Sequence, residues 1–132
     1  YVLLNNYPYN PGHAMVIPRS HSGAYSDLDD AELLDHAHLK QRTIDAMDAA
    51  FEPDGYNVGL NLGGSAAGGS IDDHLHTHVV PRWSGDNNFM AVISETKVIV
   101  EALEDSYERL HEAFADQPGA EVAGPDDAVF FP

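Results

Sequence analysis

The sequence predicts an α+β domain, in which short strands and two helices are segregated along the chain. Short apolar or alternating runs are separated by turns rich in Pro, Gly and Asn, which is typical of antiparallel strands. Two longer stretches carry apolar residues at helical spacing. The chain has 132 residues, of which 43% are hydrophobic, so it can bury one core, and we expect residues 1–132 to form a single domain.

The first two strands are expected at residues 1–6 and 13–17, paired as an antiparallel hairpin. The intervening residues 7–12 read Tyr-Pro-Tyr-Asn-Pro-Gly, a composition typical of turns, and Pro18 ends the second strand. Because Tyr1 is not a methionine and the first residues already have the composition of a strand interior, we expect a further N-terminal segment.

The first helix is expected to begin at residues 26–29, which supply a capping side chain and acidic residues, and to end at Pro53. Its apolar stripe consists of Leu33, Ala37, Ile44, Met47 and Phe51.

Further strands are expected at residues 56–62, 74–81 and 89–93, which makes about five in all. A second amphipathic helix follows, with one face formed by Ile99, Leu103, Tyr107, Leu110 and Phe114. The C-terminal tail, residues 117–132, is rich in Pro, Gly and Asp, and we expect it to pack only through Val129, Phe130 and Phe131.

The charge balance restricts the function. Twenty-two acidic residues and six basic ones give a formal net charge of −16, which argues against binding to nucleic acid or to an anionic membrane surface. A salt-rich cytoplasm would screen this charge, and we favour that interpretation over an acidic docking surface for a basic partner. The sequence has no apolar run long enough to span a bilayer and no signal-peptide pattern, so we expect a cytoplasmic protein.

Three histidines occupy alternate positions, His74, His76 and His78. In a strand, alternate side chains share one face, so the three imidazoles would project together while the residues between them face the core. Spacing alone leaves two chemistries open, a zinc site and catalysis by imidazole. The chain contains no cysteine, so a thiolate metal site is excluded within these residues.

The neighbours of the histidines favour a phosphate ligand. The small-residue run 63–70 precedes them, and it would let backbone N–H groups at Gly69 and Ser70 approach an anion. Arg82 and Trp83 follow them, and these offer a guanidinium for phosphate and an indole for a base.

The motif His-Leu-His-Thr-His-Val-Val at residues 74–80 resembles the signature of the histidine-triad family, and the likeness extends over residues 1–89. Within that family, the loop ending at Ser70 and the following Val-Val-Pro-Arg-Trp are similar to the diadenosine tetraphosphate phosphorylase branch. The resemblance implies an antiparallel sheet that continues across a homodimer.

The resemblance also implies roles for individual residues. His76 is the nucleophile that attacks the α-phosphorus, with its second ring nitrogen held by the His74 carbonyl; His78 binds phosphate oxygens and His74 orients the strand. A neutral imidazole is competent for this attack near pH 7. The substrate-binding residues are expected to be Asn5, which meets the ribose, with Asn61, Gly69, Ser70, Arg82 and Trp83. The histidines His21, His36, His38 and His111 are expected at the surface.

These roles predict an enzyme that cleaves dinucleoside polyphosphates, by phosphorolysis or by hydrolysis. The alternatives are a nucleoside phosphoramidase of the same family and a non-catalytic nucleotide-binding module. The mechanism requires no cofactor and no protein-bound metal, and Mg²⁺ is a candidate counter-ion for the substrate. The expected partners are the nucleotide and a second copy of the chain.

Overall fold

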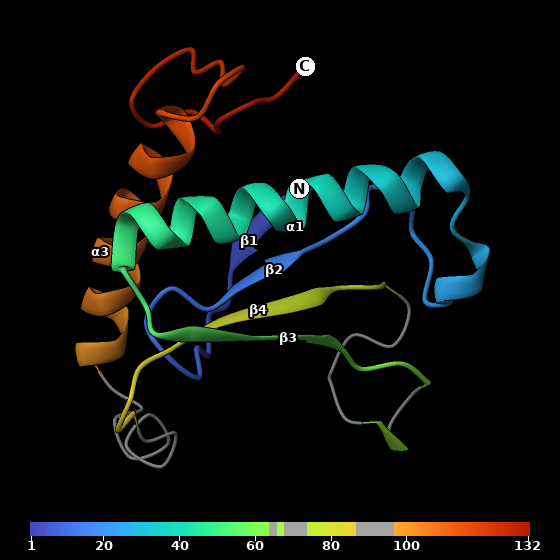
Figure 1. The fold of residues 1–132 in the computed structure, drawn as a ribbon, viewed down its shortest axis with the longest axis horizontal. Helices are drawn as coiled ribbons and strands as arrows, with labels where there is room; N and C mark the ends of the chain where they lie inside the picture. The colour runs from blue at the N-terminus through green and yellow to red at the C-terminus, as the bar shows by residue number, and fades with distance from the viewer. Residues whose placement is uncertain (64–65, 68–73, 87–96) are drawn as a thin grey trace.

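Four strands form one antiparallel sheet in the order β1-β2-β4-β3 (Figure 1). The computed structural model describes residues 1–63, 66–67, 74–86 and 97–132. The strands are β1 (Val2–Leu4), β2 (Ala14–Val16), β3 (Gly55–Leu60) and β4 (Thr77–Arg82). The helices are α1 (Asp30–Phe51) and α3 (Lys97–Ala115), with a 3-10 turn at Tyr25–Asp27 before α1. The predicted α+β class is confirmed.

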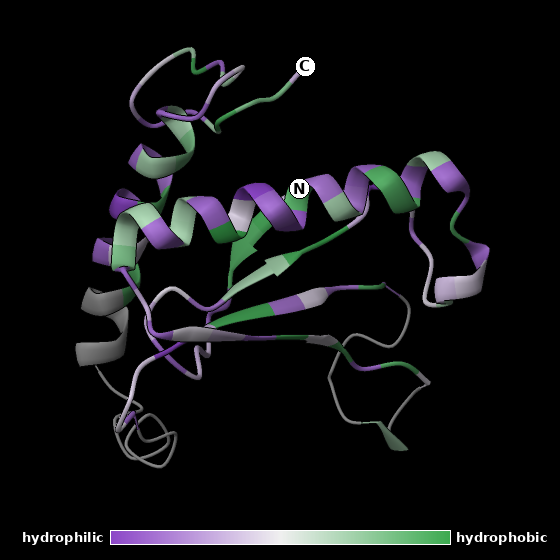
Figure 2. Ribbon diagram, in the orientation of Figure 1, coloured by the Kyte–Doolittle hydropathy of each residue, from purple (hydrophilic) through white to green (hydrophobic). Residues whose placement is uncertain are grey.

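The sheet carries its core on one face, beneath α1. Ala14, Val16 and Val79 are fully buried on the sheet side, and Met47 of α1 and Phe114 of α3 belong to the same cluster. In Figure 2 the hydrophobic colour accordingly runs along β1 and β2 under α1, whose own positions alternate along the helix. The opposite face of the sheet is therefore free for polar side chains.

The turn between β1 and β2 depends on Gly12. Its backbone has φ +83°, in the left-handed region, and a Cβ added there would lie 2.6 Å from the Phe51 ring of α1. Only glycine satisfies both the conformation and the close packing. This position sets the path of the chain directly before the second strand.

A capping box begins α1. The side chain of Asp29 accepts from the Glu32 backbone N–H at 2.8 Å, and the Asp29 N–H donates to the Glu32 carboxylate at 3.0 Å. The expected helix start at residues 26–29 is therefore confirmed at Asp29, which is the N-cap. The residues before it belong to the 3-10 turn and its end. The helix ends at Phe51, and its C-cap residue, Glu52, has a left-handed conformation before Pro53.

Two expectations about α1 are wrong. Ala37 is exposed and is not part of the buried stripe, whereas His36, expected at the surface, is only 6% exposed. His36 faces the sheet, and its ring forms a hydrogen bond with the Thr77 hydroxyl of β4. Periodicity could not reveal this, because a buried histidine counts as polar in a hydrophobic pattern.

The remaining elements follow the predicted order with smaller differences. On α3, Leu110 and Phe114 are buried as expected, whereas Tyr107 is half exposed. In the tail, Val129 and Phe131 pack against the core as expected, whereas Phe130 is 50% exposed, is not part of that cluster and forms a backbone bridge with Glu121. The fifth strand expected at 89–93 lies outside the described residues, and the homodimeric sheet stays a prediction. Neither α1 nor the described part of α3 is long and apolar enough to cross a membrane.

Candidate active site

The three alternate histidines lie at the start of β4. The strand begins at Thr77, so His78 is inside it, while His76 and His74 lie in the segment that leads into it. The intervening residues face the core side as predicted, since Thr77 contacts His36 of α1 and Val79 belongs to the core, although His76 is itself only 8% exposed. The rings of His76 and His78 are neighbours, with centroids 4.9 Å apart.

His74 serves a different purpose from the other two. Its Nε2 donates to the Pro18 carbonyl at 2.8 Å, and its ring meets the edge of the His21 ring, with centroids 4.9 Å apart. The side chain thus ties the segment before β4 to the loop after β2. This placement supports the expected role in orienting the strand.

The proton on His76 can be assigned from its partner. Nδ1 of His76 lies 3.0 Å from the His74 carbonyl oxygen. A carbonyl can only accept, so Nδ1 carries the hydrogen and Nε2 of the neutral ring keeps a free lone pair. His76 is therefore held in the tautomer that a nucleophile needs.

A fourth histidine, His13, assigns the proton on His78. The backbone N–H of Tyr9 donates to Nδ1 of His13 at 3.1 Å, so that nitrogen is an acceptor. The other nitrogen of a neutral ring, Nε2, must then carry the hydrogen, and it lies 2.9 Å from Nδ1 of His78. His78 consequently accepts at Nδ1 and carries its own hydrogen at Nε2, where it can donate to a ligand.

Sequence reasoning did not identify His13 as a site residue. It only placed this histidine at the start of the second strand. The structure shows it fully buried and in contact with His78, which is 65 positions away in sequence. Only the β2–β4 register, in which Met15 opposes His78, brings the two rings together.

Burial keeps these imidazoles neutral. The pKa of His13 is lowered to about 4, first by burial and then by the nearby charge of His78. The pKa of His78 is also lowered, by burial and by His76. At neutral pH both rings therefore act as directional hydrogen-bonding groups and not as fixed cations.

Two asparagines expected to bind substrate lie beside the histidines. Asn5 and Asn61 line the same open depression as His76 and His78. The Asn5 side-chain oxygen accepts from the Tyr7 N–H at 2.9 Å, so it caps the turn, while its amide nitrogen lies 3.5 Å from Nε2 of His13. Asn61 is exposed directly after β3. The two other expected phosphate ligands, Gly69 and Ser70, lie outside the described residues.

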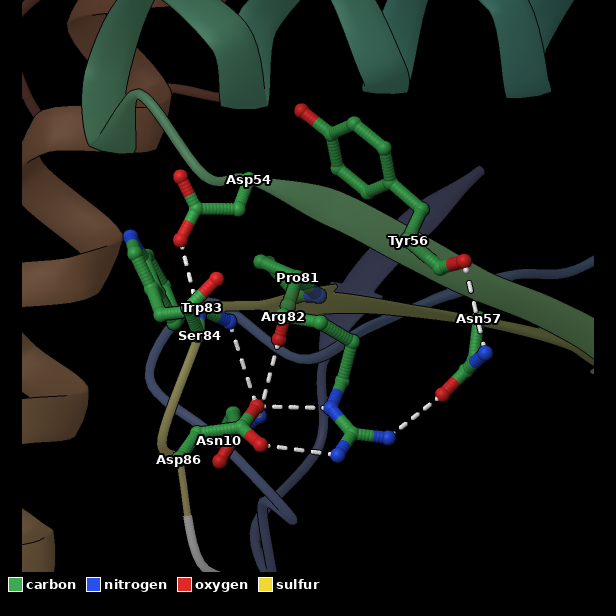
Figure 3. A network of polar contacts seen from close by, with 9 residues as sticks. All are labelled: Asn10, Asp54, Tyr56, Asn57, Pro81, Arg82, Trp83, Ser84 and Asp86. Atoms are coloured by element: carbon green, nitrogen blue, oxygen red, sulfur yellow. Dashed lines mark hydrogen bonds and ion pairs between the residues drawn. The ribbon is translucent and has the colours of Figure 1, made fainter.

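Arg82 and Trp83 are not brought to the histidines. Figure 3 shows the Arg82 guanidinium paired with Asp86, at 2.6 and 2.8 Å, and with the Asn57 side-chain oxygen at 2.6 Å. Arg82 follows His78 by four residues, roughly 13 Å along a strand. Trp83 packs against the hydrophobic core. Both residues therefore have contacts within the protein, and their binding of substrate stays a prediction.

The Arg82–Asp86 pair lies at the end of β4, and Asn10 connects it to the β1–β2 loop. Asp86 also accepts from the Asn10 side chain at 2.6 Å, and Asn10 donates to the Pro81 carbonyl at 2.9 Å. The Arg82 guanidinium holds the pKa of Asp86 well below its usual range. Since the Asn10 carbonyl accepts from the His13 N–H at 3.1 Å, this network supports the backbone that carries His13.

Behind the site, His36 of α1 contacts the strand at Thr77, between His76 and His78. Its Nε2 lies 2.7 Å from the Thr77 hydroxyl, and both side chains are buried. Among the residues that the structure describes, Nδ1 of His36 has no partner, so the hydroxyl is the only polar contact of this ring there. Burial lowers the pKa of His36, which keeps the ring neutral.

We expect Thr77→Val to lower the free energy of unfolding by about 1–3 kcal/mol, because a buried imidazole nitrogen is left unpaired. In a His36→Phe background the same substitution should cost little, because no nitrogen remains to be satisfied. Urea unfolding of the four proteins in this double-mutant cycle measures the coupling. Equal costs in both backgrounds would show that the hydrogen bond contributes nothing.

The zinc alternative can be compared with the donors present. In the described part of the chain, no group of three or more His, Cys, Asp or Glu side chains is placed to hold one metal ion. The free lone pair on His76 and the N–H on His78 instead form an adjacent nucleophile and hydrogen-bond donor. This arrangement suits attack on a phosphorus atom whose oxygens accept from His78.

Comparison with known proteins identifies a family and several similar proteins. The family model for the HIT domain matches residues 1–85. The chain is similar to an AP-4-A phosphorylase of Mycobacterium tuberculosis, with 48% identity over 118 residues, which is 89% of this chain and 60% of that protein. The chain therefore spans about 60% of the length of this relative. It is also 33% identical over 75 residues to an adenosine 5'-monophosphoramidase of Schizosaccharomyces pombe, covering 57% of this chain and 52% of that protein.

Solved structures share the fold. A Hit-like protein from Bartonella henselae has a TM-score of 0.68 at 28% identity, covering 85% of this chain and 78% of that one. A hypothetical histidine triad nucleotide-binding protein from Sulfolobus tokodaii has a TM-score of 0.67 at 27% identity, covering 93% and 85%.

Proposed function

Because the chain belongs to the HIT domain family, we propose that it cleaves dinucleoside polyphosphates at the α-phosphate through a covalent nucleotidyl group on His76. The observation that carries this proposal is the hydrogen bond from Nδ1 of His76 to the His74 carbonyl, which leaves Nε2 free to attack. The similarity to the mycobacterial AP-4-A phosphorylase supports the substrate class.

The reaction is written in two displacements. In the first, Nε2 of His76 forms a bond to the α-phosphorus, and the bond from that phosphorus to the bridging oxygen breaks. With diadenosine tetraphosphate the leaving group is ATP, and AMP is left on the imidazole. The ring charge that develops is shared with the His74 carbonyl through Nδ1–H, while the Nε2–H of His78 donates to a non-bridging oxygen.

The second displacement determines the type of enzyme. Attack by inorganic phosphate releases ADP, and attack by water releases AMP; both restore the neutral imidazole. We favour phosphorolysis on the likeness to the phosphorylase. The relation to the monophosphoramidase favours a second candidate, in which an amine is the leaving group. Homodimerisation, a cytoplasmic location and Mg²⁺ as a substrate counter-ion are part of the same proposal.

Product analysis tests this function. The protein is incubated with diadenosine tetraphosphate in concentrated KCl, with and without phosphate, and the nucleotides are separated by chromatography. We expect ADP and ATP only when phosphate is present. AMP and ATP in both mixtures would mean hydrolysis, and turnover only of an adenosine phosphoramidate would overturn the polyphosphate substrate. Light scattering in the same buffer should give at least a dimer.

A further inference from the structure

Tyr9 contacts His13 in two ways at once. Its ring stacks on the imidazole with centroids 5.0 Å apart and an angle of 14° between the planes. Its backbone N–H donates to Nδ1 of the same imidazole at 3.1 Å. Nothing in the sequence-based assignment of roles uses this residue, although the depression with His76 and His78 is lined by it.

The ring of Tyr9 lies on the solvent side of this stack. His13 is completely buried, whereas Tyr9 is 56% exposed. Since the two rings are nearly parallel, one face of the tyrosine covers the imidazole and the residue itself remains in contact with water. Removing the phenol ring would open His13 to solvent while leaving the backbone hydrogen bond chemically intact.

We propose that Tyr9 is a positioning residue for the reaction: its ring and its backbone amide together hold His13 as a neutral imidazole with the hydrogen on Nε2, so that His78 keeps its own hydrogen on the nitrogen that faces the substrate. The chain of contacts runs from Tyr9 to His13 to His78, and the centroids of His13 and His78 are 5.1 Å apart. The link to activity rests on the proposed function, whereas the state of His13 does not.

Charging His13 would disrupt this chain. A protonated ring carries hydrogen on both nitrogens, so Nδ1 could no longer accept from the Tyr9 N–H. The titratable side chains in contact with His13 are His78 and the Tyr9 phenol, and His76 follows behind His78. Asn5 is neutral, and Asp86 and Arg82 reach the same loop only through Asn10.

The direction of the pH effect follows from burial. In the native protein the pKa of His13 is lowered to about 4, so the ring is largely neutral from about one pH unit above that value upward. Exposure to water moves the pKa toward its ordinary value, about 6.5. At pH 5.5 a fully solvated His13 would be about 90% charged, and at pH 8 it would be neutral in either case.

The experiment compares Tyr9→Ala with Tyr9→Phe, which keeps the ring. Imidazole nitrogen shifts of the full chain, followed by NMR from pH 8 to pH 5, report the protonation and tautomer of His13 directly. Steady-state kinetics with diadenosine tetraphosphate over the same range report the effect on the site. The control is Tyr25→Ala, which removes another partly exposed tyrosine. Tyr25 lies in the 3-10 turn before α1 and does not line the depression with His76.

We expect His13 to stay neutral down to pH 5 in the native protein, in Tyr9→Phe and in Tyr25→Ala, and to titrate in Tyr9→Ala. Between pH 8 and pH 5.5, kcat/KM of Tyr9→Ala should decrease by a factor up to about ten times larger than the decrease in the native protein. The reason is that only about a tenth of the variant molecules would keep a neutral His13 at pH 5.5. Unchanged titration of His13 in Tyr9→Ala would overturn the proposal, and so would a changed titration with an unchanged pH–rate profile. If no variant and no native protein turns over the substrate, the proposed function fails, and the NMR titration still decides the role of Tyr9.

Discussion

His76→Asn is expected to lower kcat for diadenosine tetraphosphate by on the order of 10⁴-fold or more, the loss typical when a covalent nucleophile is removed. The asparagine amide can still donate to the His74 carbonyl, which now accepts from Nδ1 of His76 at 3.0 Å, but it has no nitrogen lone pair that could attack phosphorus. The free energy of unfolding should therefore change much less than the rate.

Three measurements make this result specific. Steady-state rates give kcat, urea unfolding gives stability, and rapid quenching with substrate labelled in the adenosine reveals the acid-labile nucleotidyl adduct. Asp45→Asn, a substitution at an exposed residue of α1 that does not line the depression with His76, should leave all three unchanged. A His76→Asn protein that retained a tenth of the native rate, or that still acquired the label, would contradict the assignment of the nucleophile.

Gly12→Ala is expected to lower the free energy of unfolding by about 3 kcal/mol or more. A non-glycine residue in the left-handed region costs about 1–2 kcal/mol, and overpacking costs typically about 1–3 kcal/mol. Both penalties apply here, because Gly12 has φ +83° and the added methyl would lie 2.6 Å from the buried Phe51 ring. Since His13 follows directly, a displaced turn should reduce activity as well.

Gly119 provides a matched control for this effect. It has the same φ of +83°, but an added Cβ would meet nothing within 4 Å. Gly119→Ala should therefore show the conformational penalty alone, about 1–2 kcal/mol, and the difference between the two variants measures the contact with Phe51. Equal losses in urea unfolding would show that the turn relaxes away from Phe51 without cost.

Much of the local structure could be predicted because it depends on neighbours in sequence. The capping box at Asp29 and Glu32, the turn before Gly12 and the alternation around His76 are all short-range features. The role of the His74 carbonyl is also local, since it lies two residues from the ring that it holds. The hydrogen bond that sets the tautomer of His76 is therefore a local feature, whereas its role as the nucleophile came from the family resemblance and stays a prediction.

The residues that sequence reasoning assigned differently depend on long-range contacts. His36 is buried because α1 turns it toward Thr77, 41 positions away. The Arg82 guanidinium pairs with Asp86, only four residues further on, but its second partner, Asn57, is brought beside it by the pairing of β3 with β4. A pattern of residue types contains no information about which charged group a guanidinium will meet first.

The sequence by itself determined the α+β class, the two helices and the histidine motif at residues 74–78, because hydrophobic periodicity and residue spacing follow from covalent neighbours. Only the tertiary structure decided that His13 completes the site and that Tyr9 covers it. The proton positions on His13 and His78 depend on a contact between these two residues, which are 65 positions apart in sequence. This contact exists only after the register between β2 and β4 has formed.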